Sequence, residues 1–131
     1  MTRWLPLLLV LALLLPSCGG EQTRRPVLDE DFEVDFRGYG ADMEGVDCTG
    51  FKLSKKQAEK FLEQAREVTW DEIRKTCDWS PCYAWGVVNL EDEKKRLRWE
   101  IRQNGVGRLI FNQGESMWLV CTECETVYAP D

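Results

Sequence analysis

Histidine does not occur in this chain of 131 residues. Its lack excludes a Ser-His-Asp or Cys-His nucleophile system, an HExxH zinc centre and pH sensing by histidine. Carboxylate catalysis stays open because there are 23 aspartate and glutamate residues, but no pair of them lies in a recognisable catalytic motif. We therefore expect no enzymatic activity, no catalytic residues, no cofactor and no bound metal.

The chain also has little positive charge, with 17 lysine and arginine residues against 23 acidic residues and a net charge of −6. An acidic surface repels phosphate groups, so we do not expect nucleic acid as a partner. The apolar run at residues 5–15 is too short for a transmembrane helix, which needs about 20 residues. Internal repeats and low-complexity tracts are missing as well.

The N-terminus has the proportions of a secretion signal, with Arg3 before the apolar run. The run leads into Leu15-Pro16-Ser17-Cys18, which resembles the lipobox of bacterial lipoproteins. In that motif leucine stands at −3, a small residue at −1 and cysteine at the cleavage point. The resemblance implies that residues 1–17 are removed and that Cys18 carries the lipid that anchors the protein to a membrane.

This resemblance also implies a location. Residue 19 is glycine, not the aspartate that keeps such lipoproteins in the inner membrane of enteric-type bacteria. We therefore expect an outer-membrane protein that faces the periplasm, held there by its lipid. The alternative is an ordinary secreted protein with an incidental cysteine near its cleavage site.

The rest of the chain is expected to form one domain. Residues 18–30 are polar and predict a flexible tether, and residues 31–131 suffice for a single small domain. Phe32, Val34 and Phe36 alternate with charged residues, which predicts a strand, and a glycine-rich loop is expected at residues 38–50.

Two capping boxes predict helices. Ser54 with Gln57 opens an amphipathic helix over residues 55–67, and Thr69 with Glu72 opens a shorter one to about residue 75. Strands are then expected at residues 82–90, around 97–101, around 109–111 and at 116–121. The predicted fold is α+β, with one or two N-terminal helices packed on a four-stranded antiparallel β-meander stabilised by disulfides.

The meander makes specific predictions. Leu97, Trp99 and Ile101 should be buried against the helix, while the arginines that alternate with them, Arg96, Arg98 and Arg102, face water. A loop at residues 104–106 would place Ile101 opposite Leu109 and Trp99 opposite Phe111. Gly86 would let a large side chain of the next strand lie over its backbone.

Five cysteines follow Cys18, an odd number. They are Cys48, Cys77, Cys82, Cys121 and Cys124. An oxidising periplasm favours disulfides, and we expect Cys82 to pair with Cys121 or Cys124, and Cys48 with Cys77. Two alternatives are a zinc site built from residues 77–82 and 121–124, and a redox centre at Cys121 and Cys124.

Five tryptophans lie beyond the signal, and we expect Trp99 to fill the core. An exposed aromatic patch for binding is predicted from a second group, which consists of Trp79, Tyr83, Trp85 and Trp118. From Cys48 to Cys124 the chain also resembles small exported bacterial proteins of uncharacterised families. The motifs that carry this resemblance are CTGFKLSKKQA, WSPCYAWG, WEI, GVG and CTEC.

The expected order of two helices and then a sheet is similar to the small lipoprotein of the outer-membrane β-barrel assembly machinery and to β-lactamase inhibitory protein. A likeness of fold does not transfer function. Our leading hypothesis is a non-enzymatic lipoprotein that binds another envelope protein or has a structural role in the envelope. The alternatives are an inhibitor of a cell-wall-active hydrolase, acting through its acidic surface, and a thiol or metal protein that uses Cys121 and Cys124.

Overall fold

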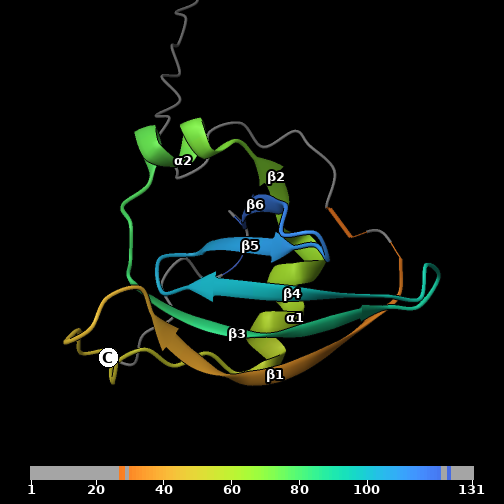
Figure 1. Ribbon diagram of the computed structural model, residues 1–131, viewed down its shortest axis with the longest axis horizontal. Coiled ribbons are helices and arrows are strands. Elements are labelled where there is room, and N and C mark those ends of the chain that lie inside the picture. The colour runs from red at the N-terminus through yellow and green to blue at the C-terminus, as the bar shows by residue number, and fades with distance from the viewer. Residues whose placement is uncertain (1–26, 29, 122–123, 125–131) are drawn as a thin grey trace, which may run out of the picture.

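The computed structural model describes residues 27–28, 30–121 and 124 (Figure 1). Its strands form one six-stranded antiparallel sheet in the order β1-β3-β4-β5-β6-β2. The elements in chain order are β1 (Phe32–Ala41), α1 (Lys55–Gln64), β2 (Arg66–Val68), α2 (Trp70–Thr76), β3 (Cys82–Leu90), β4 (Lys95–Arg102), β5 (Val106–Ile110) and β6 (Ser116–Val120).

The predicted architecture of N-terminal helices on a four-stranded meander is therefore wrong. The meander exists as β3 to β6, but β1 extends it at one edge and β2 at the other. Neither helix is N-terminal to the sheet, because β1 precedes α1 and β2 separates α1 from α2. The similarity to the assembly-machinery lipoprotein and to β-lactamase inhibitory protein was based on the expected element order. Because that order is wrong, the similarity is not supported.

Strand β1 is ten residues long and includes residues 38–41, which were expected to lie in a loop. The pairing with β3 shifts between Phe36 and Gly38, so Arg37 is an extra residue in the strand. This bulge puts Phe36 and Tyr39 on the same face, where their ring centroids are 5.4 Å apart. Because of the bulge, apolar and polar residues stop alternating near Arg37, so the sequence pattern indicated a strand shorter than β1.

Both capping boxes are confirmed. The Ser54 and Thr69 side chains accept hydrogen bonds from the backbone N–H groups of Gln57 and Glu72, whose side chains accept from the cap residues in return. Helix α1 nevertheless ends at Gln64, and residues 66–68 pair with β6. Ala65 is buried like a helical residue, which is why helical spacing did not reveal the end of α1.

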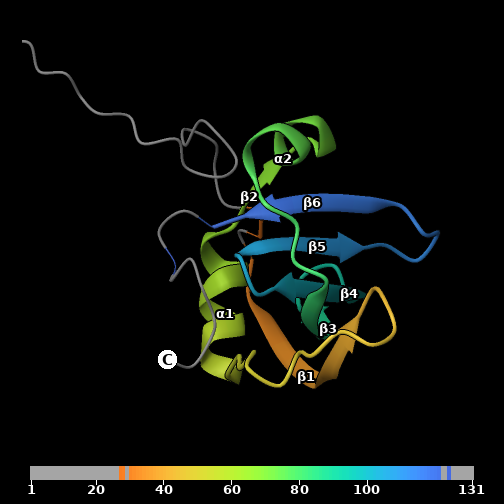
Figure 2. The same ribbon diagram turned by 90° about the vertical axis from the view of Figure 1, so that its left-hand side faces the viewer.

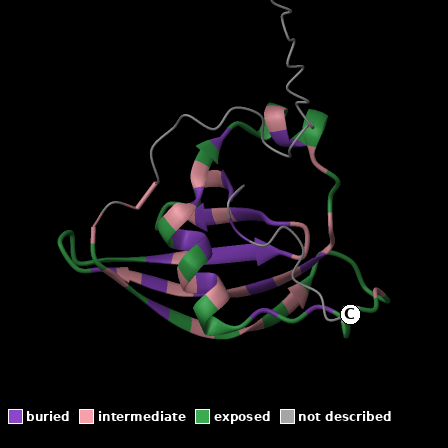
Figure 3. Ribbon diagram, turned by 180° about the vertical axis from the view of Figure 1, so that it is seen from behind, coloured by how far each residue is buried: buried purple, intermediate pink, exposed green. Residues whose placement is uncertain are grey.

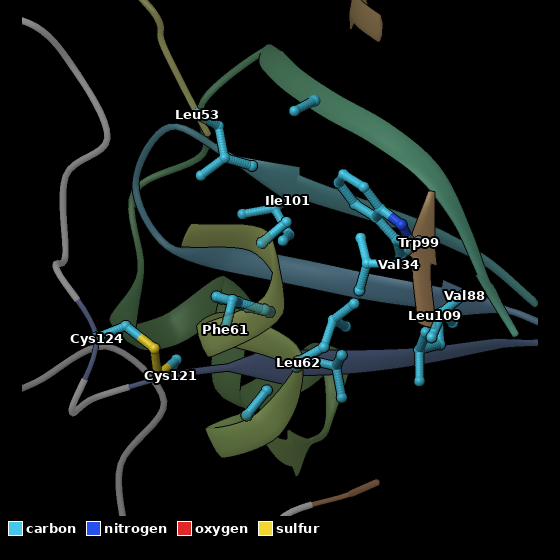
Figure 4. Close-up of a cluster of buried hydrophobic side chains, with 14 of the residues drawn as sticks. Val34, Leu53, Phe61, Leu62, Val88, Trp99, Ile101, Leu109, Cys121 and Cys124 are labelled. Atoms are coloured by element: carbon cyan, nitrogen blue, oxygen red, sulfur yellow. A yellow bond between two sulfur atoms is a disulfide. The ribbon is translucent and has the colours of Figure 1, made fainter. Parts of the chain in front are cut away.

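The two helices lie on opposite faces of the sheet. Helix α1 covers the face that is toward the viewer in Figure 3, and Figure 2 shows α2 next to β2 and β6. The main core lies between α1 and the sheet, where Phe61 and Leu62 of α1 meet Trp99, Ile101 and Leu109 (Figure 4). On the other face Ile73 of α2 forms a smaller cluster, whose other buried members are Val68, Val106 and Val120.

The hairpin between β4 and β5 is set two residues away from the predicted register. Trp99 lies opposite Leu109, and Ile101 lies opposite Gly107. The loop is Gln103–Gly105, and Gly105 has a φ of +88°, a conformation that glycine adopts at little cost. A shift of two residues keeps every side chain on its predicted face, so Leu97, Trp99 and Ile101 are buried as expected.

The chain just before β1 contacts the folded body. The Val27 backbone N–H donates to the Ala65 carbonyl at 2.9 Å, and Leu28 packs against the main core. Glu30 accepts hydrogen bonds from the Asp92 and Glu93 backbones, and desolvation raises the pKa of its carboxyl group above the ordinary value. The end of the expected tether therefore includes residues that pack on the domain.

Gly86 and Trp99 confirm the predicted close approach of a large side chain to the strand backbone. They are directly paired across β3 and β4, and the Trp99 indole donates to the Val87 carbonyl at 3.2 Å. A Cβ atom at Gly86 would lie 2.0 Å from the Asp35 carbonyl oxygen and 2.7 Å from the Trp99 ring. Only glycine fits here, because backbone and ring close on it from two sides.

Replacing Gly86 with alanine should therefore destabilise the protein by about 3 kcal/mol, the upper end of ordinary overpacking. Gly50→Ala is the matched control, because a Cβ at Gly50 meets nothing within 4 Å. Urea unfolding followed by tryptophan fluorescence measures both variants. Equal stability of the two variants would contradict the packing described here.

Candidate functional site

The candidate site is the sheet face opposite α1, called here the outer face. One row crosses it from β3 to β6, because Trp85 pairs with Glu100, Glu100 with Arg108, and Arg108 with Trp118. Tyr83 and Arg102 form a second pair on the same face. Alternation along each strand thus collects aromatic and arginine side chains that are far apart in sequence.

Arginine guanidinium groups stack on the aromatic rings of this face. Arg98 lies 4.2 Å from the Trp85 ring centroid, and Arg108 lies 5.2 Å from that of Trp118. Arg102 lies between two rings, 4.0 Å from Trp79 and 5.0 Å from Tyr83. At these distances the guanidinium groups make cation–π contacts with the rings.

The carboxylate of Glu100 lies at the centre of these arginines. It accepts from Arg98 at 3.1–3.2 Å and from Arg108 at 2.8–3.2 Å, and a nitrogen of Arg102 is 3.9 Å away. Its side chain is only 6% exposed, so this is a nearly desolvated charge with several cationic partners. Buried charges persist where they are paired in this way.

Arg102 connects the outer face to two loops. Its guanidinium donates to both carboxylate oxygens of Asp42, at 2.8 and 3.1 Å, and to the Ser80 carbonyl at 2.8 Å. The Trp79 indole donates to the same Asp42 carboxylate at 2.9 Å. These bonds fix the chain after β1 and the chain before β3 against the end of β4.

Three tryptophans form a cluster beside the arginines. Trp70 comes from the first turn of α2, Trp79 from the segment before β3, and Trp118 from β6. Their ring centroids are 4.9 to 5.8 Å apart. Trp70 is 43% exposed and Trp79 is 42% exposed, so this cluster presents large apolar area to solvent among the described residues.

The structure places all four residues of the predicted patch on the outer face or at its margin, but only Trp79 is exposed, and Tyr83, Trp85 and Trp118 are half-buried. Trp79 and Trp118 contact each other, and Arg102 and Arg98 stack on Tyr83 and Trp85. That they bind a partner stays a prediction. Trp70 also belongs to this cluster, although no sequence pattern indicated it. The expectation that the arginines of β4 face water is wrong for Arg102, whose side chain is 4% exposed.

A signal for the arginines was available in the sequence. Arg98, Glu100 and Arg102 alternate with the buried residues of β4, just as Tyr83 and Trp85 alternate with the buried residues of β3. Two neighbouring antiparallel strands place such sets side by side on one face. Asp42 and Ser80 gave no comparable signal, because they reach Arg102 from loops.

The predicted disulfide pairs are wrong. Cys48 is bonded to Cys82, and Cys121 to Cys124. Cys82 pairs with Ala41 across β1 and β3, which brings it near the loop that holds Cys48. Cys121 follows β6, and β4 and β5 separate β6 from β3 by about 14 Å, too far for a disulfide. Cys77 is not a free thiol either.

The Cys121–Cys124 disulfide is buried against α1. Figure 4 shows the bonded sulfur atoms of the two residues, which are 4% and 7% exposed. Cys124 Sγ lies 3.9 Å from the Lys60 carbonyl oxygen. The zinc alternative is contradicted, because Cys82 is bonded to Cys48 outside the proposed set. Within the described residues no group of three or more acidic or cysteine side chains is arranged to hold a metal ion.

Comparison with known proteins adds nothing to this description, because no family model, curated protein or solved structure matches the chain. The lipobox residues 15–18 lie outside the described residues. Among the helices that the structure describes, none has the length and apolar character needed to cross a membrane.

Replacing Arg102 with alanine should cost about 3 kcal/mol of stability, because it leaves two carboxylates and two aromatic rings without their shared cation. Arg96→Ala is the matched control. This residue lies on the same strand and face but is exposed, so its loss should change stability by about 0.5 kcal/mol or less. Thermal unfolding measures both, and similar melting temperatures would show that Arg102 does not hold the loops.

Proposed function

We propose that this protein is anchored by a lipid on Cys18, faces the periplasm from the outer membrane and binds another envelope protein without enzymatic activity. The observation that carries the binding role is the outer face. Tryptophan, tyrosine and arginine are the residues that dominate the energy of protein interfaces, and here they are gathered on one face.

The rigidity of the outer face supports this role. Arg98, Arg102 and Arg108 are each held by a carboxylate and an aromatic ring, so they lose little conformational freedom when a partner binds. The exposed rings of Trp70 and Trp79 supply apolar area that a partner can cover. A preorganised surface of this kind binds more tightly than an equal area of mobile side chains.

The anchor rests on the sequence alone, through Leu15-Pro16-Ser17-Cys18 and the apolar run before it. Inhibition of a cell-wall-active hydrolase is one form that partner binding can take. A disulfide between Cys121 and Cys124 is compatible with the thiol alternative, since an oxidised redox pair forms one, but the burial of both residues restricts access to it. Lack of histidine supports a role without catalysis.

The anchor is tested by fractionation and intact mass of the protein made in bacteria. We expect the membrane fraction to hold a chain that lacks residues 1–17 and carries acyl groups on Cys18. Cys18→Ala should abolish acylation, and Ser17→Ala, which keeps a small residue at −1, should not. A Cys18 thiol that alkylating reagents label after reduction would contradict the anchor.

Partner binding is tested by photo-crosslinking in cells that naturally make the protein. A photoreactive phenylalanine analogue in place of Trp70 should form a discrete adduct with another protein. The same analogue in place of Lys56, an exposed residue of α1 on the opposite side of the sheet, should not. Adducts from both positions, or from neither, would remove the support for binding through the outer face.

A further inference from the structure

The outer face differs in charge from the rest of the protein. Strands β4 and β5 direct four arginines to it, namely Arg96, Arg98, Arg102 and Arg108, while the whole chain has a net charge of −6. Glu100 and Asp42 offset two of these charges. Glu33 and Asp35 lie at the β1 edge of the face, and Asp35 is paired with Arg37 at 2.9 Å. The middle of the face therefore has an excess of positive charge.

Arg98 and Arg108 have hydrogen-bonding capacity left over. Each uses Nε and Nη2 to contact Glu100, and within the described residues neither Nη1 has a hydrogen bond. Their side chains are 38% and 29% exposed. Two guanidinium groups fixed beside one carboxylate thus present free N–H donors to solvent, and carboxylates are among the anionic groups that such donors bind strongly.

The cationic and apolar parts of the face adjoin each other. Arg108 stacks on Trp118, and Trp118 in turn contacts Trp70 and Trp79. The Trp70 ring therefore lies within about 10 Å of the Arg108 guanidinium, the length of three residues in an extended chain.

Building on the proposed partner binding, we infer that the outer face binds an acidic peptide segment of the partner protein. A carboxylate of the segment pairs with Arg98 and Arg108, and an apolar side chain two or three residues away lies on Trp70 and Trp79. Charge complementarity favours this occupant over a basic one, and it also orients the segment on the face.

The test uses the full chain in detergent and a phage-displayed library of random eight-residue peptides. We expect enriched peptides to have aspartate or glutamate two or three positions from a large apolar residue. For the best synthetic peptide, Arg98→Gln with Arg108→Gln should raise Kd at least tenfold in fluorescence polarisation. Lys56→Gln, which removes one positive charge from α1 on the opposite side of the sheet, should change Kd less than twofold.

A second variant separates binding from folding. Arg98→Lys with Arg108→Lys keeps both charges beside Glu100 but loses the planar stacked donors, so Kd should still rise several-fold while the melting temperature stays near that of the unchanged protein. Raised salt should weaken the peptide complex. Both results would support direct contact with the arginines.

The inference is overturned if no peptide is enriched, if enriched peptides are basic or uncharged, or if the Gln variants bind as well as the unchanged protein. Tighter binding of a labelled decathymidylate than of the selected peptide would also overturn it in favour of nucleic acid. If crosslinking at Trp70 captures a partner but the acidic preference fails, only this inference falls. If neither succeeds, the proposed binding role falls as well.

Discussion

Three arginine side chains at neighbouring positions of one sheet face would repel one another if nothing lay between them. Glu100 lies where its carboxylate offsets that repulsion, since it contacts Arg98, Arg108 and, at longer range, Arg102. Once the guanidinium groups are fixed, each aromatic ring of the face has a flat cation to stack against. The arrangement of Arg98 and Arg108 on the outer face depends on this buried carboxylate, while Asp42 and Ser80 hold the two loops at Arg102.

The two faces of the sheet have different structural roles. Apolar side chains of β4 point toward α1 and close the core, and the charged residues between them build the outer face. Helix α2 covers only the part of the outer face near β2 and β6, through Ile73. A single strand therefore supplies both the stability of the domain and the surface we propose for binding, and a change in its register would disrupt both.

Short-range features were predictable from the sequence, because the residues that define them are neighbours in the chain. The capping boxes at Ser54 and Thr69 are examples, and so is the alternation within β4 that predicted the burial of Leu97, Trp99 and Ile101. The register of the local hairpin between β4 and β5 was wrong because a shift of two residues leaves the same side chains buried. The other failures occurred where distant segments decide the structure. Residues 66–68 continue the helical pattern of α1 but form β2 and pair with β6. The bulge at Arg37 interrupts the alternation, so the second half of β1 was not predicted. Cys82 is bonded to Cys48 because the pairing of β1 with β3 brings it close to the loop that holds Cys48. The burial of Arg102 depends on Asp42 and Ser80, which no spacing connects to it.

The two edges of the sheet have a consequence for how copies of the protein meet. β1 is an edge strand with a bulge and the charged side chains of Glu33, Asp35 and Arg37, and β2 has only three residues. Irregular, charged or very short edges are poor templates for a strand of another molecule. Copies tethered to one membrane, as we propose, collide often at high local concentration. These edges then keep crowded neighbours from joining their sheets into fibres.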